Sequence, residues 1–221
     1  TSYVKRFVNY YYGVSKEACN WQKHFKINSN GVWYNSINNF YEIKKTKNNE
    51  VEKMSIRLKK YSYRFAEQVF NGKIQIKDEL EDIIYSATKD LSILSRPEFN
   101  KILNDEFEQR GWDTQPPVFD KDDDAYAKFD FLKDRIGVEV QFGHSSFIGI
   151  DLLKFQVASF SNLDTIDFGV YITTTAAFQK ELKSKYGLKW EGSLTFEKVV
   201  RYLPYIRSAI QVPIYVIGID V

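Results

Sequence analysis

Apolar side chains in the first half of the chain recur at the three- and four-residue spacing of helices. Residues 50–70 and residues 78–91 each carry such a stripe, which predicts a helix in each range. A third helix is predicted from Ser95, an N-cap with Glu98 three positions later, to the helix-ending Gly111. The two stripes consist of Val51, Met54, Leu58, Tyr61, Phe65 and Val69, and of Leu80, Ile83, Ile84, Ala87 and Leu91.

After residue 125 the pattern changes to short apolar runs separated by amphipathic stretches. A first helix begins at Asp151, with Leu153, Val157 and Phe160 at helical spacing. The order strand–strand–helix–strand–helix–helix–strand predicts an α/β fold with a mixed sheet covered by helices. The predicted strands are residues 126–133, 136–142, 166–173 and 214–219, and the two later helices are residues 176–186 and 195–210.

Composition narrows the classes of protein to consider. The 221 residues hold 31 Lys and Arg against 29 Asp and Glu, so the net charge of +2 does not by itself indicate a nucleic-acid partner. A hydrophobic fraction of 43% excludes a disordered chain. The single cysteine, Cys19, excludes a disulfide framework and fits the reducing cytoplasm, where we expect the protein to act. No apolar run approaches the roughly 20 residues that cross a bilayer, so no membrane partner is expected.

The strand over residues 136–142 carries the candidate chemistry. Its period of two places Glu139 and Gln141 on one face and apolar side chains on the other. A carboxylate in so apolar a strand must be solvated, paired with a cation such as Arg135 or a lysine, or bound to a metal ion. Asp130 lies nine residues earlier on the neighbouring strand, and a hairpin-like return would bring its carboxylate close to Glu139. Two carboxylates, a backbone carbonyl and waters form a site suited to Mg²⁺.

A site of this kind suits the hydrolysis of phosphodiesters. A metal ion there can polarise the phosphate and lower the pKa of a bound water. Gln141 is too weak a base to accept the proton, so we expect it to position water or phosphate by hydrogen bonds. The alternative, a structural ion pair at Glu139, remains open on the pattern alone.

The spacing Asp-x8-Glu-x-Gln resembles the core motif of the PD-(D/E)XK nucleases, with Gln141 in place of the usual lysine. More closely, residues 130–147 resemble type II restriction endonucleases of the BstYI/BglII-like group, and weaker likeness covers most of residues 95–221. The resemblance implies a PD-(D/E)XK nuclease-like mixed sheet flanked by helices. We expect one endonuclease domain over residues 1–221, with a mostly helical region at 1–94 and the catalytic core at 95–221.

The resemblance also implies an activity: Mg²⁺-dependent cleavage of both strands of a short palindromic site in double-stranded DNA by a homodimer. The relatives cut GATC-centred sites, but His144 stands where they carry other base-contacting residues, so the recognition sequence stays open. Two alternatives are a structure-specific repair or recombination nuclease and a non-catalytic DNA-binding protein. A dimer interface is expected on the helices before residue 111.

Residue by residue, the resemblance implies metal ligands at Asp130, Glu139 and the backbone carbonyl of Val140, with Gln141 at the position of the motif lysine. Asn100 is either a further catalytic residue or a polar residue on a helix surface.

The remaining candidates are interpreted as DNA contacts. His144 is either a base reader or a surface-loop histidine. Ser145 and Ser146 either contact phosphate or cap the next helix, and one of Ser193 and Thr195 is a helix cap in preference to a base reader. Lys189 completes the predicted DNA-binding set: His144, Ser145, Ser146, Lys189, Ser193 and Thr195.

Overall fold

The computed structural model of the chain divides into two compact units, residues 1–52 and residues 53–221. The expectation of one domain over residues 1–221 stays a prediction, and each unit is described by itself. Cys19 lies outside the described residues. The structure describes residues 25–27, 33–35, 54–91, 95–119, 127–160, 164–190 and 192–221.

In the first unit, the described residues form one antiparallel pair of strands. Strand β1 (Phe25–Ile27) pairs with β2 (Trp33–Asn35), with Phe25 opposite Asn35.

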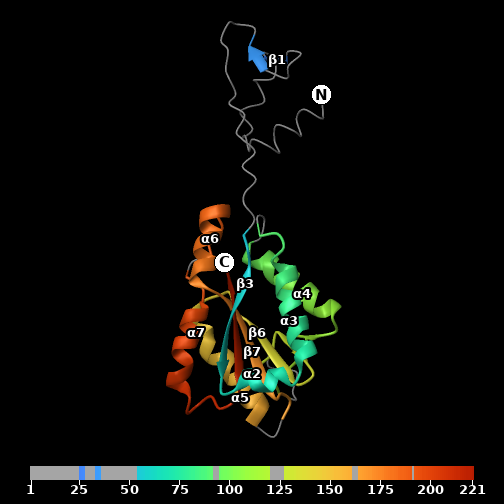
Figure 1. The fold of residues 1–221 in the computed structure, drawn as a ribbon, viewed down its shortest axis with the longest axis vertical. Coiled ribbons are helices and arrows are strands. Elements are labelled where there is room, and N and C mark those ends of the chain that lie inside the picture. The colour runs from blue at the N-terminus through green and yellow to red at the C-terminus, as the bar shows by residue number, and fades with distance from the viewer. Residues whose placement is uncertain are drawn as a thin grey trace. The chain divides into compact units, whose positions relative to one another are not determined.

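The second unit is built on a six-stranded sheet with the order β3-β8-β7-β6-β5-β4 (Figure 1). Strands β6, β7 and β8 run parallel to one another, and the outer strands pair antiparallel, which makes the sheet mixed as predicted. The strands are β3 (Arg57–Tyr63), β4 (Asp113–Thr114), β5 (Phe131–Lys133), β6 (Ile136–Val140), β7 (Phe168–Thr174) and β8 (Ile214–Asp220).

Helices cover both faces of this sheet. Figure 1 shows α3 and α4 on one side of the strands and α7 on the other. The helices are α2 (Ala66–Asn71), α3 (Ile74–Ala87), α4 (Arg96–Gln109), α5 (Ile148–Phe160), α6 (Ala176–Tyr186) and α7 (Phe196–Tyr202), with 3₁₀ turns at Ser145–Phe147 and Leu203–Ile206. Among the described residues no helix is both long and apolar enough to span a membrane.

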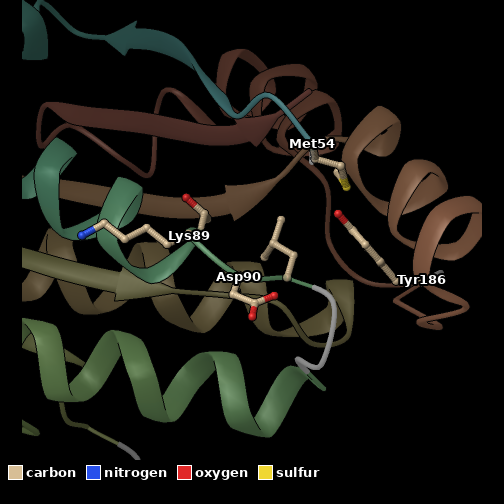
Figure 2. Close-up of a pocket in the computed structure, with 6 residues that line it drawn as sticks. Met54, Lys89, Asp90 and Tyr186 are labelled. Carbon is tan, nitrogen blue, oxygen red and sulfur yellow. The ribbon is translucent and has the colours of Figure 1, made fainter. Parts of the chain in front are cut away.

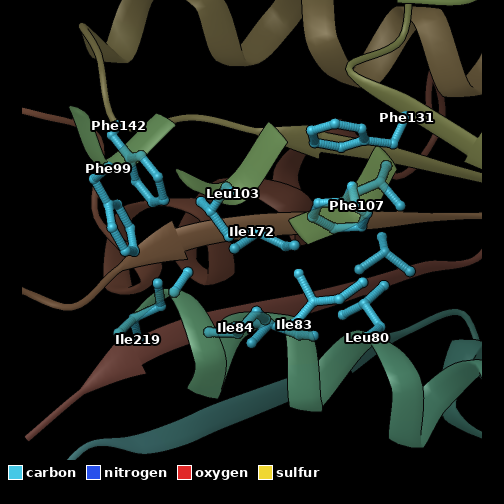
Figure 3. Packing of buried hydrophobic residues seen from close by; sticks show 14 of the residues in the cluster. Leu80, Ile83, Ile84, Phe99, Leu103, Phe107, Phe131, Phe142, Ile172 and Ile219 are labelled. Carbon is cyan, nitrogen blue, oxygen red and sulfur yellow. The ribbon is translucent and has the colours of Figure 1, made fainter. Parts of the chain in front are cut away.

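Two apolar clusters lie on the two faces. The first joins α3 and α4 to the sheet, and Figure 3 shows their side chains gathered around Phe131 and Ile172. Its tightest contact is the stacking of Phe107 on Phe131, with ring centroids 3.9 Å apart. The second cluster joins α5 and α7 to the opposite face through residues such as Phe155 and Val199. The sheet is therefore a central layer with a helical layer on each side.

The third predicted helix, α4, follows its sequence signals closely. Ser95 caps it with both hydrogen bonds of a capping box, to and from Glu98. Gly111 takes a positive φ of 74° just beyond its end, as a helix-ending glycine does. The helices at 78–91 and 176–186 are also confirmed as α3 and α6, although α3 begins four residues earlier. The helix at 195–210 is shorter, because α7 gives way to a 3₁₀ turn at Leu203.

The predicted helix at 50–70 is wrong over its centre. Residues Arg57–Tyr63 form strand β3, which pairs with the whole of β8 from Arg57 opposite Asp220 to Tyr63 opposite Ile214. Exposed Lys59 and Lys60 suit this edge position, since charged side chains discourage pairing with another chain. Apolar residues at three- and four-residue spacing thus fit a half-buried edge strand once a long partner strand is available.

The helix predicted from Asp151 begins three residues earlier, at Ile148, and its predicted apolar face is also wrong. Leu153 and Phe160 are 51% and 57% exposed, whereas Leu152 and Phe155 are fully buried against the sheet. Asp151 shares the buried side of the helix. A polar residue on the inner face makes the outward stripe look like the core face in the sequence.

Candidate active site

The β5–β6 hairpin holds the two predicted acidic ligands together. Its turn is Asp134–Arg135, both at positive φ (48° and 63°), and its register sets Phe131 opposite Val138. The Oδ2 atom of Asp130 accepts a hydrogen bond from the backbone N–H of Val140, at 2.7 Å. The hairpin return expected from the sequence is present, and it fixes the Asp130 carboxylate beside the strand segment that carries Glu139.

Glu139 points to the face of the sheet that α5 covers, and its side chain is 4% exposed. Lys154 of α5 places its Nζ atom 2.6 Å from Oε1 of Glu139. The same Nζ donates a 2.9 Å hydrogen bond to the carbonyl of Lys128 and lies 3.6 Å from Oδ1 of Asp151. The ion pair with a lysine that the sequence left open for Glu139 therefore exists, but it is buried rather than on an exposed strand.

Gln141 and Tyr171 both bind Asp151, the acid of α5. The Nε2 atom of Gln141 donates to Oδ2 of Asp151 at 3.2 Å, and the Tyr171 hydroxyl donates to the same oxygen at 2.8 Å. The Oε1 atom of Gln141 accepts from the N–H of Gly143 at 2.7 Å. Its amide is held in one orientation, and one amide hydrogen remains for water or phosphate.

Burial and mutual repulsion dominate the electrostatics of this group. Burial, and next the charge of Asp130, raise the pKa of Glu139 to about 9, although Lys154 opposes the rise. Burial likewise raises the pKa of Asp130, against the lowering effect of the Val140 N–H. Burial and then Asp151 raise the pKa of Tyr171, so its hydroxyl remains a hydrogen-bond donor. Perturbed carboxyl pKa values of this kind occur at functional sites and in structural ion-pair networks.

The donor set fits a hard divalent cation such as Mg²⁺. The Asp130 and Glu139 carboxylates and the Val140 carbonyl are oxygen donors that the hairpin brings together, and waters would complete the shell. Within the described ranges no three His, Cys, Asp or Glu side chains are arranged to hold a metal ion. The candidate ligands are thus two carboxylates, and Asp151 contacts Gln141, Lys154 and Tyr171.

Sequence reasoning missed Asp151, Lys154 and Tyr171 as members of the site. From the sequence, Asp151 was interpreted only as the start of a helix. Asp151 and Lys154 are three residues apart, which places both on one face of that helix. That shared face, on a helix otherwise rich in apolar residues, was the available signal. Tyr171, within a run of apolar residues, gave none.

The first group of predicted DNA contacts lies in the turn that leads from β6 to α5. His144 is exposed and is itself the cap of the 3₁₀ turn Ser145–Phe147, because its Nδ1 atom accepts from the N–H of Ser146. Neither serine is the cap residue of this turn, so the capping role predicted for them belongs to His144. The exposure of His144 and Ser146 leaves both accessible to DNA.

The second group is less accessible. Ser193 is 2% exposed; its hydroxyl donates to the Trp190 carbonyl at 2.6 Å and accepts from Arg96 at 3.0 Å. Thr195 occupies the N-cap position of α7, as predicted, but its side chain makes no cap hydrogen bond. Lys189 is exposed. Burial argues against base reading by Ser193, whereas a DNA contact by the exposed Lys189 stays a prediction.

Asn100 is exposed on α4, one residue after the buried Phe99. Helix α4 packs on the face of the sheet opposite to Glu139, and in the described part of the chain the Asn100 side chain bonds none of the residues around Asp130. A catalytic role for Asn100 stays a prediction.

A pocket of about 280 Å³ lies apart from these residues (Figure 2). Met54 before β3, the segment after α3 and Tyr186 at the end of α6 line it, and it shares no residue with the carboxylate site. Its lining holds one acid, Asp90, and one lysine, Lys89. The pocket adds nothing to the chemistry at β6.

Comparisons with known proteins identify a family and a similar fold. Residues 58–219 match the family described as restriction endonuclease BglII/BglIII. The fold is similar to the crystal structure of restriction endonuclease BglII complexed with a DNA 16-mer, with a TM-score of 0.58 and 22% identity over 75% of this chain and 76% of that one. Free BglII is similar with a TM-score of 0.51 and 19% identity over 75% and 79% of the two chains. Among curated protein sequences, none matches significantly.

Proposed function

The chain belongs to the BglII/BglIII family of restriction endonucleases and is a type II site-specific deoxyribonuclease, and on that premise we propose the finer points of its activity. It requires Mg²⁺ and cuts both strands of a short palindromic site in double-stranded DNA, centred on GATC. It acts in the cytoplasm as a homodimer. The observation that supports this best is the hydrogen bond from the Val140 N–H to Asp130, which fixes the Asp130 carboxylate beside the strand residue Glu139.

The residues of the site divide the work. The carboxylates of Asp130 and Glu139 and the carbonyl of Val140 would hold the metal ion. When bound, Mg²⁺ would polarise the scissile phosphate and lower the pKa of a water. Gln141, held by Asp151 and Gly143, presents its remaining amide hydrogen to that water or to a phosphate oxygen. Burial by α5 keeps bulk water away from Glu139.

His144, Ser145, Ser146 and Lys189 are the proposed DNA contacts. His144 and Ser146 lie exposed just beyond the strand that carries Glu139, so DNA bound at the metal site would pass over them. A histidine can accept or donate one hydrogen bond to a base edge, and Lys189 can contact phosphate. Substitution of His144 tests the base contact, because loss of a base reader relaxes the cleaved sequence at one position.

A homodimer follows from a palindromic site, since two-fold symmetry of the protein matches that of the DNA. The outer side of the segment from Phe147 through α5 supplies a surface for it: Phe147, Ile150, Leu153 and Phe160 are each more than half exposed. A second copy would cover these side chains. Sedimentation should then give a dimer for the wild type and a monomer for Leu153→Asp. The variant Ile74→Asp tests instead the dimer interface that the sequence predicted on the helices before residue 111.

Incubation with plasmid DNA, with Mg²⁺ or with a chelator, tests the activity. Discrete fragments with constant ends, formed only with the metal ion, are the expected result. Sequencing those ends gives the recognition site and shows whether GATC lies at its centre. Cleavage restricted to branched or damaged DNA would instead indicate a structure-specific nuclease, and binding without cleavage would indicate a DNA-binding protein.

A further inference from the structure

The carboxylate site contains a lysine that no motif position predicts. Gln141, at the position of the usual motif lysine, carries no charge. The ammonium of Lys154, on α5, contacts the acids Glu139 and Asp151. Its Nζ lies 2.6 Å from Glu139 and 3.6 Å from Asp151, and its side chain is only 14% exposed. Lysines are rarely buried unless they are paired, and Lys154 is paired with two acids of the site.

Lys154 and Gln141 converge on one carboxylate. Gln141 binds Oδ2 of Asp151, and Lys154 lies beside Oδ1 of the same residue. A lysine at position 141 would therefore place its ammonium next to the group that Lys154 now contacts. A lysine at position 141, beside the strand, or at position 154, on the helix, would therefore place a positive charge beside Asp151.

Resting on the metal-dependent activity proposed above, we infer that Lys154 is a positioning residue of the nuclease: from α5 it supplies the positive charge that Gln141 lacks. It acts through Glu139. The ammonium contacts Oε1 of that carboxylate, and its bond to the Lys128 carbonyl ties α5 to the segment two residues before Asp130. Oε2 of Glu139 would then bind the metal ion. Partners that orient a metal ligand in this way typically matter 10- to 100-fold for metal affinity or activity.

Four variants test this role. Lys154→Met removes the charge and keeps most of the volume, and Lys154→Arg keeps the charge. Gln141→Lys combined with Lys154→Met moves the charge to the strand. Lys77→Met is the matched control, because Lys77 is equally buried (12% exposed) and pairs with Glu67 at 3.7 Å, but belongs to α3.

The readouts are Mn²⁺ binding by calorimetry on protein without DNA, and single-turnover cleavage of plasmid with Mg²⁺. We expect Lys154→Met to weaken both at least about 10-fold. Lys154→Arg and the combined variant should recover most of the loss, and Lys77→Met should match the wild type in both. Unfolding temperatures confirm that each variant is folded when it is measured.

Two results overturn the inference. The first is wild-type Mn²⁺ affinity and cleavage in Lys154→Met. The second is that Gln141→Lys, added to Lys154→Met, restores neither Mn²⁺ affinity nor cleavage. Lys154 would then have a packing role alone. A wild-type protein that neither binds Mn²⁺ nor cuts DNA would instead refute the proposed function, so the two failures are distinguishable.

Discussion

The two faces of β6 are formed by the same five residues, but one packs in an apolar cluster and the other carries the candidate site. On one face Ile136 and Val138 are fully buried in the cluster formed with α3 and α4. On the other, Glu139 lies against α5 in a group of acids, a lysine and a glutamine. Burial of the apolar face stabilises the folded protein, whereas burial of charge on the polar face costs folding free energy. At β6 itself, apolar packing therefore lies on one face of the strand and the proposed chemistry on the other.

The largest expected effect comes from the polar face. Asp130→Ala or Glu139→Ala should reduce plasmid cleavage at least about a thousandfold, since a bound metal ion supplies several kcal/mol of transition-state stabilisation. DNA binding, measured by gel shift with Ca²⁺, should be retained. Asp105→Ala, an exposed acid on α4, is the control and should cleave as the wild type does. Unchanged cleavage in both site variants would remove the proposed metal site.

The apolar face should respond in stability alone. Phe107→Ala deletes the ring stacked on Phe131 and should lower the free energy of unfolding by about 3–5 kcal/mol in urea titration. Tyr205→Ala, at a side chain 83% exposed, should change it by less than about 0.5 kcal/mol. Cleavage per folded molecule should stay at the wild-type rate in both variants. A specific loss of cleavage in folded Phe107→Ala would break the division between the faces.

A smaller effect is expected in the pH dependence of stability without metal. Because the pKa of Glu139 is about 9 in the folded protein and near 4.5 in the unfolded chain, the folded state binds the extra proton between these values. Stability should therefore fall as the pH rises from 5 to 9.

Glu139→Gln cannot titrate, so its unfolding free energy should vary less over the same range. Chemical denaturation at several pH values in a chelator measures both slopes. Equal slopes for variant and wild type would show that Glu139 does not bury a proton in the folded state.

The smallest change concerns the start of α4. Ser95→Ala removes the side-chain acceptor of the capping box and should cost about 1 kcal/mol in unfolding free energy. Ser95→Asp keeps an acceptor there and should restore most of it. Thermal unfolding of the three proteins makes the comparison. Equal stability of Ser95→Ala and the wild type would mean that packing alone holds this end of the helix.

The hairpin and α4 could be predicted because their signals are local. The Asp130 and Glu139 spacing follows from two short strands and a tight turn, and the Ser95–Glu98 box lies within four residues. Strand β3 could not, because its partner β8 is more than 150 residues away and its apolar spacing also fits a helix. Pairing with β8 makes this segment a strand rather than a helix.

The polar side of the site was harder to predict for the same reason. Lys154 and Asp151 follow the strand by a turn and a helix, and only packing of α5 on the sheet brings them to Glu139. In the sequence they are ordinary charged residues on a helix with two apolar sides. The exposed stripe at Leu153 and Phe160 then drew the prediction to the wrong side of that helix.

The tight turn at Asp134–Arg135 also bears on how the protein assembles. Residues 130 and 139 meet by closing a loop of under ten residues, which costs little chain entropy and takes well under a millisecond. Lys154 arrives only when the crossover after β6 has folded back. During folding the two acids are thus neighbours before their counter-charge is in place.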